Sequence, residues 1–228
     1  MNQKLSKKKK LIICGAGETA LLAFEYFAKD SDFEVIAFSI HSKYKKSKEL
    51  LGLPIYDIES IHKNIPTSEY YLFVALSSNH LNRDRAKLYN ELKEKGYNFA
   101  SYVSSKAFVW DNVEIGENCF ILENNVLQPF TKVGDNVTLW SGNHIGHRTE
   151  ICKHVFISSH CVISGYCEIG EYSFLGVNCT LADNVKVASD NFISMGTVIS
   201  KNTDHDGLYR GNPSEKHKLS AKRLCKIK

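Results

Sequence analysis

The feature that most constrains this chain is a six-residue repeat that runs from residue 102 to residue 203 without an insertion. It comprises 17 consecutive hexads, and the second position of every hexad is Ile, Leu or Val. A period of six fits neither one face of a helix nor the alternation of a single strand. It is typical of a short strand and a turn that repeat around a coil, so that each repeat buries its apolar residue by stacking on its neighbours.

The sixth position of the hexads is mostly small, and four of the seven cysteines stand there: Cys119, Cys161, Cys167 and Cys179. At a packing position a cysteine acts as a small apolar side chain, so we expect neither metal binding nor redox chemistry from these four. The odd cysteine count and the absence of a CxxC pair also argue against a disulfide framework. The sequence therefore favours a reducing cytoplasm.

Residues before the repeat alternate between strand-like and helix-like segments. We expect strands over 11–14, 33–38 and 70–76, a helix that ends near Asp30, and a second helix over 82–95. This alternation predicts an α/β domain in which helices cover a parallel sheet.

A glycine turn follows the first expected strand and opens the first helix. Its spacing, Gly15-x-Gly17-x-x-Ala20, is that of a dinucleotide-binding turn, although tight packing of strand against helix explains it nearly as well. The second strand does not end on the acidic residue that an NAD-binding domain offers to the ribose. We expect the turn to hold the diphosphate of a nucleotide sugar, with these residues around it: Gly15, Gly17, Glu18, Ser77, Asn79 and Arg83.

Charge and hydropathy exclude two classes of partner. Lys plus Arg number 29 and Asp plus Glu number 25, which is too even for a dedicated nucleic-acid binder. No apolar run approaches the roughly 18 residues of a membrane span. The basic and then apolar start resembles a signal peptide, but Gly15, Gly17 and Glu18 interrupt its apolar part, so we expect a cytoplasmic protein without membrane insertion.

The repeat and the preceding glycine turn together resemble the hexapeptide-repeat bacterial sugar acyltransferases of the sialic acid O-acetyltransferase and bacillosamine-pathway N-acetyltransferase type. The resemblance implies a Rossmann-like domain over 1–101, a left-handed parallel β-helix over 102–203, and a C-terminal loop and basic tail over 204–228. It also implies a homotrimer that transfers an acetyl group from acetyl-CoA to a sugar, without a metal cofactor, in lipopolysaccharide or capsule biosynthesis.

The same resemblance assigns roles to residues of the repeat. The stretch 147–165 matches the family's catalytic segment in phase, which makes His147 the general base and places Gly165 one coil above it. A backbone N–H would hold the oxyanion. Ser164 and Gly165 would line the CoA arm, and the segment Gly211-Asn212-Pro213 resembles the loop that wraps the adenine end of CoA.

Two positions depart from the family pattern. Arg148 stands where relatives often carry an acid, and Phe156 stands where some carry a second histidine. The residue that orients His147 is therefore open, and the local alternatives are Glu150, His144 and Asn143. We expect the remaining turn histidines, His154 and His160, to be solvated. No two of the four histidines between 144 and 160 are 18 residues apart, so they do not stack into a metal site within one chain.

Three functions remain in order of preference. The first is N-acetyl transfer to a nucleotide-linked amino sugar, with a UDP- or dTDP-sugar as the first expectation and GDP also open. The second is sugar O-acetyl transfer, which uses the same base. The third is a non-catalytic scaffold that keeps the β-helix for trimerisation, against which the unbroken repeat and the phase of His147 argue.

Overall fold

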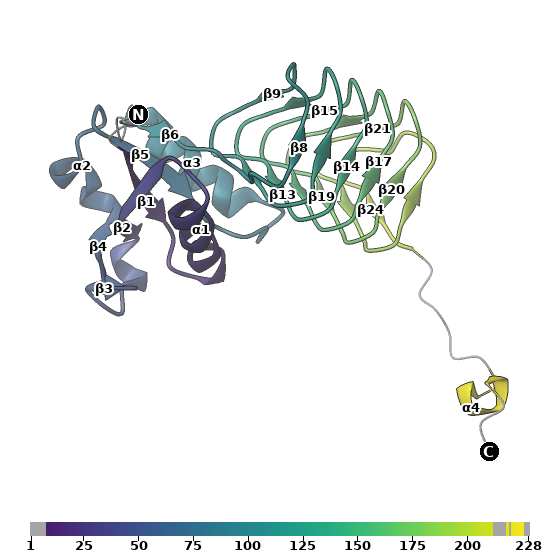
Figure 1. Ribbon diagram of the computed structural model, residues 1–228, viewed down its shortest axis with the longest axis horizontal. Coiled ribbons are helices and arrows are strands. Elements are labelled where there is room, and N and C mark those ends of the chain that lie inside the picture. The colour runs from purple at the N-terminus through teal and green to yellow at the C-terminus, as the bar shows by residue number, and fades with distance from the viewer. Residues whose placement is uncertain (1–7, 212–217, 219, 226–228) are drawn as a thin grey trace, which may run out of the picture.

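The computed structural model describes residues 8–211, 218 and 220–225. An N-terminal α/β domain lies at one end of a long three-sided prism, and the two are joined directly at residues 99–102 (Figure 1). A short helix, α4 (Ala221–Leu224), follows the prism.

The N-terminal domain contains six strands and three α-helices in its described part. The strands are β1 (Lys9–Cys14), β2 (Phe33–Ile40), β3 (Glu49–Leu50), β4 (Leu53–Asp57), β5 (Tyr70–Val74) and β6 (Asn98–Phe99). The helices are α1 (Glu18–Lys29), α2 (Ile61–Asn64) and α3 (Arg83–Glu94), with short 3-10 turns at Ser42–Tyr44 and Ile58–Ser60. The sheet order is β3-β4-β2-β1-β5-β6, and the described pairs are parallel except β3 with β4. The expected strands and helices are present. The sequence did not predict β3, β6 and α2, which are short, or β4, in which Pro54 interrupts the strand pattern.

Alternate residues of β1 build the two faces of this sheet. Leu11 and Ile13 pack on one side with Phe27 of α1, and Ile12 and Cys14 pack on the other side with α2 and α3. The α1 side also packs against aromatic residues of the first coils of the prism: the Phe27 and Tyr102 ring centroids are 5.5 Å apart. One apolar core therefore joins the domain to the prism.

The prism is a parallel β-helix with three faces, and its strands pair at intervals of 18 residues, as Phe120 does with Thr138. The aromatic face contains β7 (Tyr102–Val103), β10 (Phe120–Ile121), β13 (Thr138–Leu139), β16 (Phe156–Ile157), β19 (Phe174–Leu175), β22 (Phe192–Ile193) and β24 (Leu208–Tyr209). The apolar face contains β8 (Phe108–Val109), β11 (Val126–Leu127), β14 (His144–Ile145), β17 (Val162–Ile163), β20 (Thr180–Leu181) and β23 (Val198–Ile199). The charged face contains β9 (Glu114–Ile115), β12 (Lys132–Val133), β15 (Glu150–Ile151), β18 (Glu168–Ile169) and β21 (Lys186–Val187). This architecture fits the expected left-handed β-helix of hexapeptide repeats.

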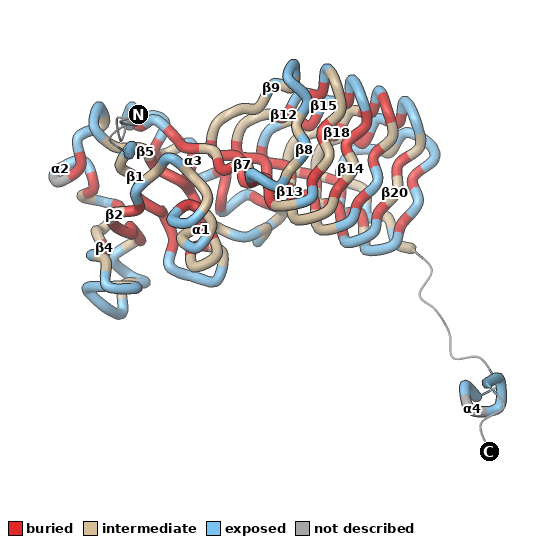
Figure 2. The backbone as a smooth tube through the Cα atoms, in the orientation of Figure 1, coloured by how far each residue is buried: buried red, intermediate tan, exposed pale blue. Residues whose placement is uncertain are grey.

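Burial follows the hexad phase around each coil (Figure 2). Second-position residues such as Ile163 and Leu175 are fully buried, and so are the sixth-position cysteines. Each of these thiols donates to a main-chain carbonyl 15 residues further on, as Cys161 does to Gly176 at 3.1 Å. Burial raises the pKa of Cys119 to about 12, which keeps its thiol protonated at neutral pH. The prediction that these cysteines pack in the core is confirmed.

Candidate functional site

His147 lies in the turn that joins the apolar face to the charged face. Ile145 before it and Thr149 after it are buried in the prism, and Arg148 adopts the left-handed conformation with φ 58°. Between these two buried residues the His147 side chain points outward, and it is exposed. The side chain of Gln128, one coil below, accepts the main-chain N–H of His147 at 3.0 Å.

Gly165 lies directly above the His147 ring. A Cβ atom placed on Gly165 would be 2.6 Å from Cε1 and 3.1 Å from Nε2 of His147. Any side chain at position 165 would therefore push the imidazole away. The predicted stacking is present, and the main-chain N–H of Tyr166 donates to the His147 carbonyl at 2.9 Å. The Tyr166 ring closes one side of the imidazole, edge to face, at 4.9 Å between centroids.

None of the three expected orienting residues hydrogen-bonds the His147 ring in the described residues. Asn143 is buried, where its amide donates to the Trp140 carbonyl and its oxygen accepts the N–H of Cys161. Asn143 points away from the His147 ring because it stands at the sixth position of its hexad, which faces the core of the prism. His144 and Glu150 occupy outward first positions on different faces.

Asp183 is the carboxylate that sequence analysis did not single out. It lies at the same corner of the prism as Gly165, one coil above it, and its Oδ1 accepts the Gly165 main-chain N–H at 3.0 Å. The signal that could have found it was the spacing of 18, which relates His147 to Gly165 and Gly165 to Asp183.

The expected CoA-binding residues lie on or beyond this corner. Ser164 precedes Gly165, and its carbonyl accepts the Thr149 hydroxyl at 3.1 Å. Gly211 packs on the last coil, with its Cβ position 3.1 Å from the Gly196 carbonyl. Asn212 and Pro213 lie outside the described residues.

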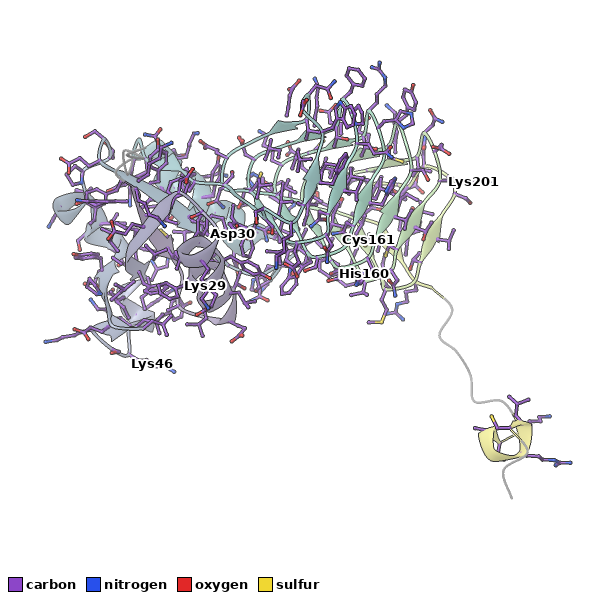
Figure 3. All side chains as sticks on the ribbon, in the orientation of Figure 1. Lys29, Asp30, Lys46, His160, Cys161 and Lys201 are labelled. Atoms are coloured by element: carbon purple, nitrogen blue, oxygen red, sulfur yellow. The ribbon has the colours of Figure 1, made fainter. Side chains whose placement is uncertain are left out.

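A cavity of about 590 Å³ opens at the carboxyl ends of β1 and β2 in the N-terminal domain. Gly15 and Gly17 line its floor, and apolar side chains form much of its wall. Gly15 has a φ of 143°, and a Cβ there would be 2.7 Å from the Ala75 carbonyl, so a side chain is excluded. Lys43, Tyr44 and Lys46 line the cavity from the loop after β2, and Lys46 projects at the lower edge of the domain (Figure 3).

The other expected nucleotide-sugar residues are not among those that line this cavity. Glu18 begins α1 with its side chain exposed. Ser77 and Asn79 are exposed beyond β5. Arg83 pairs with Asp190 of the prism and lies 3.9 Å from the centre of the Tyr172 ring. This arginine therefore contacts the prism.

The expectation that His154 is solvated is wrong, because α3 covers the prism corner on which it stands. His154 is 3% exposed, its ring stacks on Tyr172, and its Nδ1 lies 2.9 Å from the Asn136 amide nitrogen. Burial, and next the charge of Arg85, lower its pKa to about 4. His160, in contrast, is exposed at another corner.

In the part of the chain that the structure describes, no group of three or more His, Cys, Asp or Glu side chains is arranged to hold a metal ion. None of the helices described is both long enough and apolar enough to cross a membrane.

Comparison with known proteins supports the fold. Residues 112–145 and 130–165 match the family described as bacterial transferase hexapeptide (six repeats). Among solved structures, the acetyltransferase domain of PglB from Neisseria gonorrhoeae FA1090 is 20% identical, with a TM-score of 0.79 over 91% of this chain and 99% of that chain. A His-to-Asn mutant of perosamine N-acetyltransferase from Caulobacter crescentus, in complex with CoA and GDP-perosamine, is 20% identical, with a TM-score of 0.76 over 87% and 92% of the two chains.

A third structure, WeeI from Acinetobacter baumannii AYE, is 19% identical, with a TM-score of 0.53 over 90% of this chain and 98% of that chain. A search of curated proteins finds no match. At these identities the structural likeness establishes the fold, and the family match confirms the hexapeptide repeat over residues 112–165.

Proposed function

We propose that this protein is an acetyl-CoA-dependent N-acetyltransferase that acts on a nucleotide-linked amino sugar in surface-glycan biosynthesis. Two structural neighbours support the reaction class by what their names state: one is an acetyltransferase domain, and one is an N-acetyltransferase with CoA and GDP-perosamine bound.

The observation that carries the proposal is the exposed His147 ring resting on the bare backbone of Gly165. A thioester must reach the base without steric hindrance, and Gly165 presents no side chain beside the His147 ring. Histidine is the residue type that titrates nearest neutrality, which suits it to proton transfer at ordinary pH.

The reaction follows from this geometry. The uncharged amine attacks the thioester carbonyl, and His147 takes a proton from the nitrogen as the C–N bond forms. The C–S bond then breaks, and the imidazolium returns the proton to the sulfur of CoA. The main-chain N–H groups of His147, Gly165 and Tyr166 already donate to Gln128, Asp183 and the His147 carbonyl, so they do not supply the expected oxyanion donor in this arrangement.

The N-terminal cavity is the proposed acceptor site, and we interpret the domain around it as Rossmann-like. Gly17 is the N-cap of α1, and the helix start presents main-chain N–H groups to an anion. Lys43 and Lys46 line the same cavity and would add positive charge for the diphosphate. The apolar wall would hold the base or sugar.

A homotrimer would bring the two sites together. The cavity is lined only by residues 15–88, and His147 is not among them. The apolar face leaves Val162 44% and Val198 71% exposed, whereas the charged face pairs Lys186 with Glu168 at 3.0 Å. We infer that the apolar face packs against a second copy, which would seat the second copy beside the His147 corner.

The experiment that tests the function is acetyl transfer with purified protein. Release of the CoA thiol is measured against a panel of UDP-, dTDP- and GDP-linked sugars, each with an amine or a hydroxyl at the acceptor carbon. Turnover with an amine member supports the proposal, and turnover with hydroxyl members alone makes the protein an O-acetyltransferase. No turnover with any member would favour the non-catalytic scaffold.

A further inference from the structure

Three residues stand at the same corner of the prism in successive coils: His147, Gly165 and Asp183. The first presents an imidazole, the second a main chain without a side chain, and the third a carboxylate. His147 rests on Gly165 from below, and Asp183 reaches the N–H of Gly165 from above. Since successive coils are about 4.8 Å apart, both side chains lean into the gap that the missing side chain of Gly165 leaves.

A backbone cap explains part of this contact. Asp135 accepts the N–H of Glu117 at 3.0 Å through the same relation of 18 residues at a different corner. The difference is that position 117 carries a side chain, whereas position 165 carries none and has an imidazole against it. Among the described residues the Gly165 N–H is the one hydrogen bond that Asp183 makes, and it uses Oδ1 only. The side chain is exposed and Oδ2 makes no hydrogen bond to the described residues, so it can meet a substrate group that approaches the Gly165 backbone where the His147 ring contacts it.

We propose that Asp183 binds the protonated amine of the acceptor and makes the site select an amine over a hydroxyl. This inference rests on the proposed function and addresses a choice that His147 does not make, because a base serves both acceptors. An amine near neutrality arrives as an ammonium group, and a carboxylate holds a cation more strongly than it holds a hydroxyl.

The proton balance is consistent with this role. The ammonium held by Asp183 first loses one proton to solvent, and the free amine attacks the thioester carbon. His147 takes the second proton from the nitrogen and passes it to the departing sulfur. Asp183 gives up and takes up no proton in this sequence of steps, and its role is to hold the nitrogen.

The test compares Asp183→Asn with the matched variant Asp135→Asn. Both keep an oxygen that accepts the main-chain N–H, so both should retain the fold, which thermal unfolding checks. Calorimetric binding then compares two ligands that differ only in the acceptor group, GDP-perosamine and GDP-rhamnose, or the equivalent pair on the nucleotide that the turnover panel identifies. CoA is present in each titration.

We expect wild-type protein and Asp135→Asn to bind the amine ligand at least about tenfold more tightly than the hydroxyl ligand, since a hydrogen bond to a charged group is worth roughly 1.5–3 kcal/mol. Asp183→Asn should lose this preference, and its KM for the amine acceptor should rise by a similar factor. Its affinity for the hydroxyl ligand should stay unchanged.

The outcomes separate the two proposals. If wild-type protein transfers acetyl to the amine and Asp183→Asn matches Asp135→Asn, the role of Asp183 is overturned and the function stands. If amine preference depends on Asp183 but no acetyl transfer occurs, the role of Asp183 stands and the function is overturned. Equal binding of both ligands by wild-type protein overturns the role of Asp183 whether or not turnover is seen.

Discussion

The guanidinium of Arg85 donates from Nη2 to the main-chain carbonyl of His154 at 3.3 Å, across the boundary between α3 and the prism. The same group also contacts Asn136, Val155 and Ser77, so one arginine ties the loop after β5 to two coils. Arg85 is 2% exposed, and burial lowers its pKa to about 10. The side chain still carries its charge at neutral pH, and the acceptors of its hydrogen bonds are uncharged oxygens.

Arg85→Met should destabilise the protein by about 2–4 kcal/mol, because buried carbonyl oxygens lose their donor. The shift of the urea midpoint measures this. Lys87→Met changes an exposed residue of the same helix and should stay within about 0.5 kcal/mol of wild type. An Arg85→Met midpoint equal to that of Lys87→Met would mean that the contact contributes little.

His154 should make the protein less stable as the pH falls. Its pKa of about 4 in the folded state lies below the 6.5 of an ordinary histidine, so the unfolded chain binds more protons between these values. Stability is then full above pH 6.5 and falls as the pH drops towards 4, by roughly 3 kcal/mol in all.

His154→Asn is the matching variant, because φ at this position is 63° and asparagine tolerates that conformation. Unfolding curves between pH 4 and 7 should show a smaller fall for the variant than for wild type. Parallel curves would exclude His154 as the source.

Ile163→Asp and Leu175→Asp should each unfold the prism. Both side chains are fully buried, and an unpaired carboxylate there costs several kcal/mol. Asn184→Asp introduces the same group at an exposed turn and should leave the circular dichroism melting curve nearly unchanged. A soluble Ile163→Asp protein with the wild-type curve would contradict the hexad phase.

His147→Ala should lower kcat for acetyl transfer by about a hundredfold or more, with little change in CoA or nucleotide binding. His160→Ala should cost much less, since that side chain stands at another corner of the prism. The loss in His147→Ala should shrink at high pH, where the free amine forms without help. A rate within about threefold of wild type at neutral pH would rule His147 out as the base.

Light scattering should give three times the mass of one chain at micromolar concentration. Val198→Asp, on the exposed apolar face, should shift the protein towards the monomer, whereas Lys186→Ala on the charged face should not. A wild-type monomer would contradict both the assembly and the shared site.

The repeat alone determined the architecture of the prism. Each hexad specifies a local strand and turn, so reading the second position from Val103 to Ile199 was enough to place the core, the stacking of Gly165 on His147 and the burial of the cysteines. The spacing of 18 also relates Gly165 to Asp183, a relation that the sequence analysis missed, and the sequence has no sign that this carboxylate reaches the glycine N–H.

Tertiary structure decided what each corner of the prism faces. His154 and His160 occupy the same hexad position, yet α3 covers the first and leaves the second exposed. The same packing directs Arg83 to Asp190, away from the glycine cavity. A repeat gives its three corners nearly the same backbone geometry. The packing of the N-terminal domain, which depends on contacts between distant residues such as Phe27 and Tyr102, decides which corner is covered.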